Sequence, residues 1–321
     1  MYYPWLESCW HSLNRYQQQQ ALPNALLLVG EKGFGYEQLV NVFANSIYCT
    51  QLTADGFACG KCSPCQMFIA GSYPDFSIIK PEEGDATIKI AAIRKLIESL
   101  TLSRQYNRQR IIIITSVDEM LHQASNSLLK TLEEPNDGTS LILIAHKLAN
   151  VPATIKSRCQ IIPTRSLSKE TMLEWLVSQG CDQPLAYLNL ANGSPIFAHQ
   201  YWGKNILTIR NEIFELFLSV VNNKTDPLVF SERCFKLKEL PLSSWMISWL
   251  TDAIILSYDE SCETITNIDL LTNLKVLIKK LHLKKLFSLF DQAIEISQFE
   301  SGQINQQLLF DDFAISCIAK D

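Results

Sequence analysis

The chain has 321 residues, a formal net charge of −5 at pH 7 and a hydrophobic share of 47%. This hydrophobic share excludes a disordered chain, and the net charge excludes a protein that holds nucleic acid mainly through overall positive charge. With only 12 glycines and 12 prolines, the chain also lacks the turn residues of an all-β protein with many short strands.

The first half of the chain predicts strands that alternate with helices. Apolar residues in 36–48 and 90–100 recur at helical spacing, and a later helix ends before Pro135. Short apolar runs predict the strands Ala25–Val29, Phe76–Ile79, Arg110–Thr115, Leu141–Ala145 and Gln160–Ile162. Strands separated by helices favour an α/β domain whose parallel sheet is covered on both faces.

The second half is predicted to be helical. Residues 166–205 indicate short helices that break near Gly180 and Gly193. Five or six amphipathic helices are expected over residues 206–320, among them Ile206–Val221, Ser244–Tyr258 and Asn305–Ala319. The composition therefore predicts three domains, with boundaries 1–165, 166–205 and 206–321. No apolar run approaches the length that crosses a bilayer, and the first residues lack a secretory pattern, so a cytoplasmic location is expected.

Four of the ten cysteines cluster with the spacing C-x9-C-x2-C-x2-C, namely Cys49, Cys59, Cys62 and Cys65. Four thiolates suit a tetrahedral zinc ion, and a closed four-cysteine site is structural because it keeps no open position for catalysis. Gly60 and Pro64 are expected to keep this stretch from forming a helix, so that the cysteines converge. Four buried thiols and an iron–sulfur cluster remain alternatives, although the spacing departs from the bacterial ferredoxin run.

A glycine-rich turn follows the first predicted strand and precedes a helix, which is the context of a phosphate-binding loop. The residues of this turn are Gly30, Gly33, Gly35, Tyr36 and Glu37. A functional loop would carry lysine at position 36 and serine or threonine at position 37. Tyr36 has no charge, Glu37 would repel phosphate, and Lys32 is in the wrong place. We therefore expect a degenerate loop that binds no ATP.

Two acidic pairs are candidates for catalytic carboxylates. Asp118-Glu119 follow the third predicted strand three residues too late for a Mg²⁺-binding pair, so we interpret them as a solvated helix start. Glu133-Glu134 are interpreted as the end of a solvated helix before Pro135, with a subunit contact left open.

Cys159 is interpreted as a packed thiol. The lysine-rich segment Leu274–Phe290 is interpreted as a solvated face over a leucine core.

Several motifs resemble one known family. They are the segments Asn126–Pro135, with sequence NSLLKTLEEP, and Pro152–Cys159, with sequence PATIKSRC. Together with Tyr3–Leu6, the four-cysteine module and Gly193-Ser194-Pro195, they resemble the bacterial clamp-loader AAA+ family over residues 3–6 and 25–196. The resemblance implies an AAA+ α/β domain with an inserted zinc module, a small helical lid and an all-helical oligomerisation (collar) domain.

The chain departs from the ATP-hydrolysing members of that family at every position that would serve its own nucleotide. Thr115-Ser116 stand where those members carry Asp-Glu, His146-Lys147 where they carry polar sensors, and Ile196 where the lid supplies an arginine. Arg158, which the resemblance assigns to the ATP of a neighbouring subunit, is present. The alternative is a surface arginine that pairs with a nearby carboxylate. The resemblance therefore implies no intrinsic catalysis by this chain.

The implied function is that of a non-hydrolysing stator subunit of a replicative clamp loader, an accessory to a DNA-directed DNA polymerase. Its implied partners are the tau/gamma ATPase subunits and the delta subunit, with the sliding clamp and primed DNA reached through the complex. An active ATPase subunit of the same complex and a zinc-containing nucleic-acid-binding protein are the alternatives. The missing lysine and acidic pair disfavour the first, and a cysteine module whose only basic residue is Lys61 disfavours the second.

Overall fold

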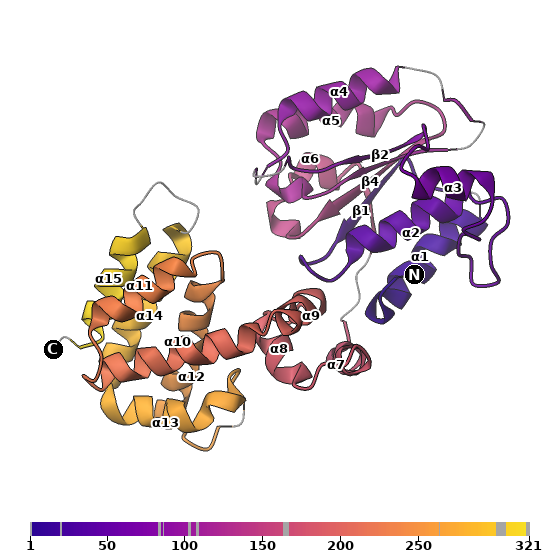
Figure 1. Cartoon of the computed structure of the whole chain (residues 1–321). Coiled ribbons are helices and arrows are strands. Elements are labelled where there is room, and N and C mark those ends of the chain that lie inside the picture. Colours follow the sequence, from indigo (N-terminus) through magenta and orange to yellow (C-terminus); the bar gives the residue numbers. More distant parts are fainter. Residues whose placement is uncertain are drawn as a thin grey trace. The chain divides into compact units, whose positions relative to one another are not determined.

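The computed structural model describes residues 2–19, 21–82, 85, 87–101, 104–106, 109–162, 167–262, 264–299 and 306–318. The chain divides into two compact units, Met1–Trp175 and Leu176–Asp321 (Figure 1). Among the described residues, all strands lie in the first unit and the second unit is helical. None of the described helices is long and apolar enough to cross a membrane.

The first unit contains a five-stranded parallel sheet with the order β2-β3-β4-β1-β5. Its strands are β1 (Ala25–Val29), β2 (Phe76–Ile79), β3 (Arg110–Ile114), β4 (Thr139–Ala145) and β5 (Gln160–Ile162). Every residue of β4 is buried, as expected for a parallel strand covered on both faces. The predicted fold class, a parallel α/β domain followed by helices, is confirmed.

Helices cover both faces of this sheet: α4 and α5 lie on one face, and α1 and α2 on the other (Figure 1). The helices of this unit are α1 (Glu7–Gln18), α2 (Tyr36–Tyr48), α3 (Ser63–Ile69), α4 (Ile90–Leu100), α5 (His122–Glu133) and α6 (Ala153–Lys156). Ile112 and Ile114 of β3 share one core with α4 and α5. Because successive strand residues point to opposite faces, the buried Ile111 and Ile113 face the other side.

Two strand boundaries differ from the prediction. β3 ends at Ile114, one residue early, and β4 begins at Thr139, two residues before the apolar run. Thr139 and Ser140 are polar and therefore gave no strand signal, yet both are buried. The Ser140 hydroxyl donates a hydrogen bond of 2.9 Å to the carbonyl oxygen of Pro23, so the buried hydroxyl has a hydrogen-bond partner.

The second unit is built from helices, and two of the breaks between them fall at the glycines where the sequence predicted them. Gly180 and Gly193 adopt φ values of 90° and 83°, which favour glycine. Six α-helices follow residue 205 in the described part of the chain, in agreement with the predicted five or six. The helices of this unit are α8 (Pro184–Leu190), α9 (Pro195–Gly203), α10 (Ile206–Val221), α11 (Pro227–Lys236), α12 (Leu242–Tyr258), α13 (Leu271–Lys280), α14 (Leu283–Phe299) and α15 (Gln306–Ser316).

The predicted ends of two helices need comment. The helix expected from Ser244 begins at Leu242, directly after its N-cap residue Pro241. The helix expected over 305–319 is observed as α15, and residues 305 and 319 lie outside the described part of the chain. The predicted domain boundary at 165/166 also lies outside it, and α7 (Lys169–Ser178) runs across the division between the two units. The three-domain boundaries stay a prediction.

Candidate functional site

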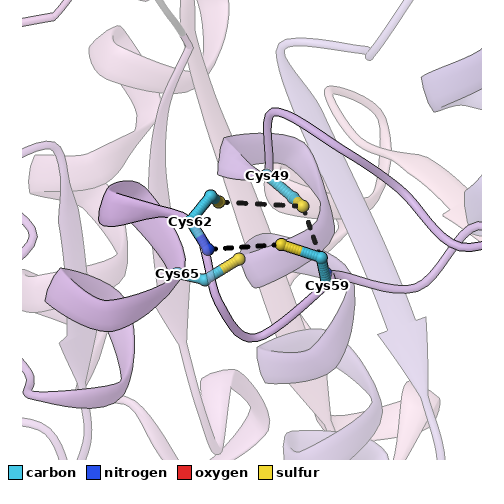
Figure 2. A group of neighbouring side chains, drawn as sticks. All are labelled: Cys49, Cys59, Cys62 and Cys65. Atoms are coloured by element: carbon cyan, nitrogen blue, oxygen red, sulfur yellow. Dashed lines mark hydrogen bonds between the residues drawn. The ribbon is translucent and has the colours of Figure 1, made fainter.

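The four clustered cysteines come together in the first unit (Figure 2). Their sulfur atoms all lie within 4.8 Å of one another. Cys49 directly follows α2, and Cys62 directly precedes α3. Cys59 lies in the connecting loop and Cys65 in the first turn of α3. Two helix ends and one loop therefore converge on a single point.

The local reason for this convergence differs from the prediction. We expected Gly60 and Pro64 to prevent a helix, but Pro64 lies in the first turn of α3. Proline is favoured there because the first N–H groups of a helix have no partner within the helix. Gly60 adopts φ of 70°, and an added Cβ would meet no atom within 4 Å. Glycine is therefore required at this turn for its backbone conformation.

Backbone N–H groups point at the sulfur atoms. The Cys59 N–H donates to the Cys49 sulfur at 3.2 Å, and the Cys62 N–H donates to the Cys59 sulfur at 3.3 Å (Figure 2). The Lys61 N–H also donates to Cys59, and these backbone bonds lower the pKa of the Cys59 thiol. Burial raises the pKa of the Cys65 thiol. Thiolate ligands must lose their protons, which these N–H donors favour.

The geometry fits a tetrahedral ion. Zn–S bonds near 2.3 Å place the sulfur atoms of a tetrahedral site about 3.8 Å apart. The sulfur atoms of Cys62 and Cys49 are 4.0 Å apart. Four sulfur donors are soft ligands that suit zinc, and they fill all four positions. The cluster can therefore hold a metal ion but leaves no position for a substrate.

Two contacts tie this cysteine module to the rest of the first unit. The Tyr48 hydroxyl, one residue before Cys49, donates to the Asp75 carbonyl at 2.8 Å and accepts from the Ile111 N–H at 3.1 Å. On the other side, the Phe57 ring stacks on Trp10 of α1 with ring centroids 4.6 Å apart. The module is thus fixed both to strand β3 and to helix α1.

The degenerate phosphate loop is filled by one of its own side chains. Tyr36, the first residue of α2, is only 4% exposed, and burial raises the pKa of its phenol. A Cβ placed on Gly30 would lie 1.9 Å from a ring carbon of Tyr36. The ring therefore packs directly against the first glycine of the loop. The position expected to carry a phosphate-binding lysine instead carries a ring that packs on the loop itself.

The polar groups around this loop bind one another. The Lys32 ammonium pairs with the Glu119 carboxylate at 2.7 Å. The His146 ring bridges the Gly30 carbonyl oxygen and the Ser116 hydroxyl, each at 3.2 Å. The sequence could not indicate these contacts, because Lys32 and Glu119 lie 87 residues apart.

The interpretation of Asp118-Glu119 as a solvated helix start is wrong. Both residues lie in a short 3-10 turn, Val117–Glu119, and α5 begins only at His122. The Asp118 carboxylate accepts hydrogen bonds from the backbone N–H groups of His146 and Lys147, at 2.9 and 2.8 Å. It therefore fixes the chain just beyond β4.

Arg158 lies at the opposite end of the sheet from the phosphate loop. It follows α6 and precedes β5, whose first residue, Gln160, pairs with Leu26 near the start of β1. The phosphate loop begins where β1 ends, at Gly30. β1 has five residues, or about 16 Å at a rise of ~3.3 Å per residue. Arg158 therefore lies at the amino ends of the strands, whereas this chain's own loop lies at their carboxyl ends, too far away for Arg158 to serve it.

The Arg158 guanidinium pairs with Glu133, the last residue of α5. Nε donates to the Glu133 carboxylate at 2.7 Å, and Nη2 donates to the same oxygen. The two side chains are 30% and 49% exposed. The structure thus contains the pairing with a nearby carboxylate that was the alternative for Arg158, although the sequence did not identify Glu133 as the partner.

The remaining sequence candidates have ordinary surroundings. Burial raises the pKa of Cys159 to about 11, and this thiol packs against the core under α4 and α5, which confirms the packed-thiol interpretation. Ile196 lies in the first turn of α9, where the Ser194 hydroxyl caps the helix. In the lysine-rich segment, Leu274, Leu277 and Leu286 are buried while the lysines are exposed or half-buried, as expected for a solvated face.

The chain is similar to several known proteins. Among solved structures, a gamma subunit-related DNA polymerase III protein of Thermotoga maritima is similar with a TM-score of 0.49 and 18% identity, covering 95% of this chain and 97% of that one. DNA polymerase III subunit delta' of Haemophilus influenzae is 28% identical over 255 residues, which span 78% of this chain and 77% of the relative. The corresponding subunit of Pseudomonas aeruginosa is 30% identical over 253 residues, or 77% and 75%.

Two family descriptions cover most of the chain. The family described as DNA polymerase III, delta subunit, matches residues 5–168. The family described as DNA polymerase III, delta subunit, C terminal, matches residues 204–317. The α/β part and the C-terminal helical part are thus matched separately, in the expected order. The chain therefore belongs to the family of delta-prime subunits of the DNA polymerase III clamp loader.

Proposed function

We propose that the chain is the non-hydrolysing stator of a bacterial clamp loader and supplies Arg158 in trans to ATP on a neighbouring subunit. The observation that carries this proposal is the position of Arg158, at the amino ends of the strands and away from the chain's own loop. An arginine there can meet a nucleotide only if another subunit brings it. The proposed neighbours are tau/gamma ATPase subunits and the delta subunit, and the complex acts on the sliding clamp and primed DNA.

The chemistry of the side chain suits this role. Arginine is always charged, and its planar guanidinium has five N–H donors, so it can contact its own chain and a phosphate at the same time. Placed beside a γ-phosphate, it stabilises the negative charge that develops on the transferring group. A comparable arginine finger contributes on the order of 10³-fold or more in GTPases. A complex with several ATP sites should lose a smaller share of its total rate.

The phosphate loop supports the non-hydrolysing part of the proposal. The Tyr36 ring packs against Gly30, and Lys32 is neutralised by Glu119. Thr115 and Ser116 stand where a Mg²⁺-binding carboxylate would be needed, and neither side chain has one. ATP binding by this chain would thus need the loop to open and would still lack its catalytic carboxylates.

We also propose that the cysteine module holds one Zn²⁺ with a structural role. The four sulfur donors, their spacing and the N–H groups that point at them support a closed tetrahedral site. When bound, the ion would join the end of α2 to the start of α3. Elemental analysis of the purified chain tests this, and a brown protein that absorbs visible light would indicate iron–sulfur instead.

The stator proposal is tested in a clamp loader reconstituted with the Arg158→Ala chain. The variant should fold and assemble, yet the complex should hydrolyse ATP at least about tenfold more slowly at the affected site, a conservative fraction of the finger effect. Arg158→Lys should rescue poorly, because an ammonium has only three N–H donors and cannot reproduce the planar set of the guanidinium. Arg94→Ala, at an exposed arginine of α4, is the matched control. Normal hydrolysis and clamp loading by the Arg158→Ala complex would contradict the proposal.

A further inference from the structure

The contacts of Arg158 within its own chain leave little of its guanidinium free to rotate. The Glu133 carboxylate accepts from Nε at 2.7 Å and from Nη2. On the other edge, Nη1 donates to the Thr154 carbonyl oxygen at 2.9 Å and to the Ser157 hydroxyl at 3.3 Å. The plane of the guanidinium is therefore held from both sides.

The number of donors shows what remains available to a partner. A guanidinium has five N–H donors. Four are used by Glu133, Thr154 and Ser157 in hydrogen bonds among the described residues, which leaves one N–H on Nη2. Because Nη2 shares the charge of the guanidinium, and the side chain as a whole is 30% exposed, the side chain can still meet an anion from another subunit.

The placement of Glu133 is unfavourable for the helix that carries it. Glu133 is the last residue of α5, where the helix dipole is negative and a carboxylate is repelled. Its neighbour Glu134 adds a second negative charge at the same end. The helix itself therefore gains nothing from Glu133, whereas the guanidinium of Arg158 gains its main anchor.

We propose that Glu133 is a positioning residue, which fixes the guanidinium of Arg158 so that its remaining Nη2 N–H faces the neighbour's phosphate. This inference rests on the proposed function of Arg158. Glu133 touches no nucleotide and acts only through the arginine. An arginine held in one orientation loses less side-chain entropy when it meets the phosphate.

The test is the steady-state ATP hydrolysis of the reconstituted clamp loader. Glu133→Ala should lower kcat at the affected site by about twofold to fivefold, the size expected for an exposed ion pair that orients a side chain, with KM for ATP unchanged. Glu133→Gln keeps an acceptor oxygen and should recover part of the loss. Glu134→Ala removes a neighbouring carboxylate that makes no hydrogen bond to Arg158 and should leave kcat unchanged.

The double variant separates this inference from the function on which it depends. If Glu133 acts through Arg158, Glu133→Ala should have no further effect in the Arg158→Ala chain. Equal losses in both backgrounds, an unchanged kcat, or a kcat that rises because the arginine is released would each overturn the positioning role. If Arg158→Ala itself leaves hydrolysis unchanged, it is the proposed function of Arg158 that fails.

Discussion

The two ends of the sheet have opposite characters. At the carboxyl ends, Tyr36 packs on Gly30, Lys32 pairs with Glu119, and His146 bridges two polar groups. At the amino ends, Arg158 is partly exposed and keeps one donor N–H. The difference shows which chemistry this chain has lost and which it has kept. The groups beside the degenerate loop contact one another, while Arg158, although paired with Glu133, lies away from that loop and keeps one donor N–H.

The cysteine module lies near the amino ends of the strands, where Tyr48, next to Cys49, contacts Asp75 and Ile111, and its removal should have the largest effect. Cys62→Ser should abolish zinc binding and destabilise the first unit by more than about 4 kcal/mol, because structural zinc contributes its binding energy to folding. Zinc content and thermal unfolding measure the two effects.

Cys262→Ser is the control for this change, since Cys262 lies in the second unit outside the cluster. It should keep one zinc per chain and a normal unfolding temperature. A Cys62→Ser chain with full zinc content, or with unchanged stability after losing it, would contradict the structural role.

Removing the ring that fills the phosphate loop should have the next largest effect. Tyr36→Ala leaves a cavity against Gly30 and should lower the free energy of unfolding by about 3 kcal/mol or more. Denaturant unfolding measures this change. Tyr258→Ala, at a tyrosine that is 72% exposed, should cost far less. Similar costs for the two variants would mean that the loop is not held closed by Tyr36.

Restoring the loop's missing residues should have the smallest effect. The double variant Tyr36→Lys with Glu37→Thr regains the lysine and the hydroxyl that phosphate loops use. It should still show no ATP hydrolysis, since Thr115 and Ser116 supply no carboxylate for Mg²⁺ and Ile196 supplies no arginine. Calorimetry with ATP and a phosphate-release assay test this. Micromolar ATP affinity in the natural chain would contradict the idea of a closed loop.

The sequence was informative where a local pattern determines the structure. Continuous apolar runs such as Ala25–Val29 predicted the buried strands, and the cysteine spacing predicted the cluster, because both depend on near neighbours in the chain. Where local patterns were ambiguous, the prediction erred. Pro64 was interpreted as a helix breaker although it begins a helix, and the polar start of β4 was missed.

The contacts that give each end of the sheet its character were invisible in the sequence. Lys32 reaches Glu119 across 87 residues, and Arg158 reaches Glu133 across 25. Only the strand order brings such residues together, because it places β1 between β4 and β5. Sequence reasoning therefore identified Arg158 by resemblance but could not identify the carboxylate that orients it.

The same strand order has a consequence for synthesis on the ribosome. β1 is made early, yet its two partners are β4, which ends at Ala145, and β5, which ends at Ile162. At ~5–20 residues per second, the strand waits on the order of 10 s for its first partner. During that time an apolar segment has both edges unpaired, which is the condition that favours aggregation. The nascent chain therefore depends on protection of Ala25–Val29 until the middle of the sheet can close.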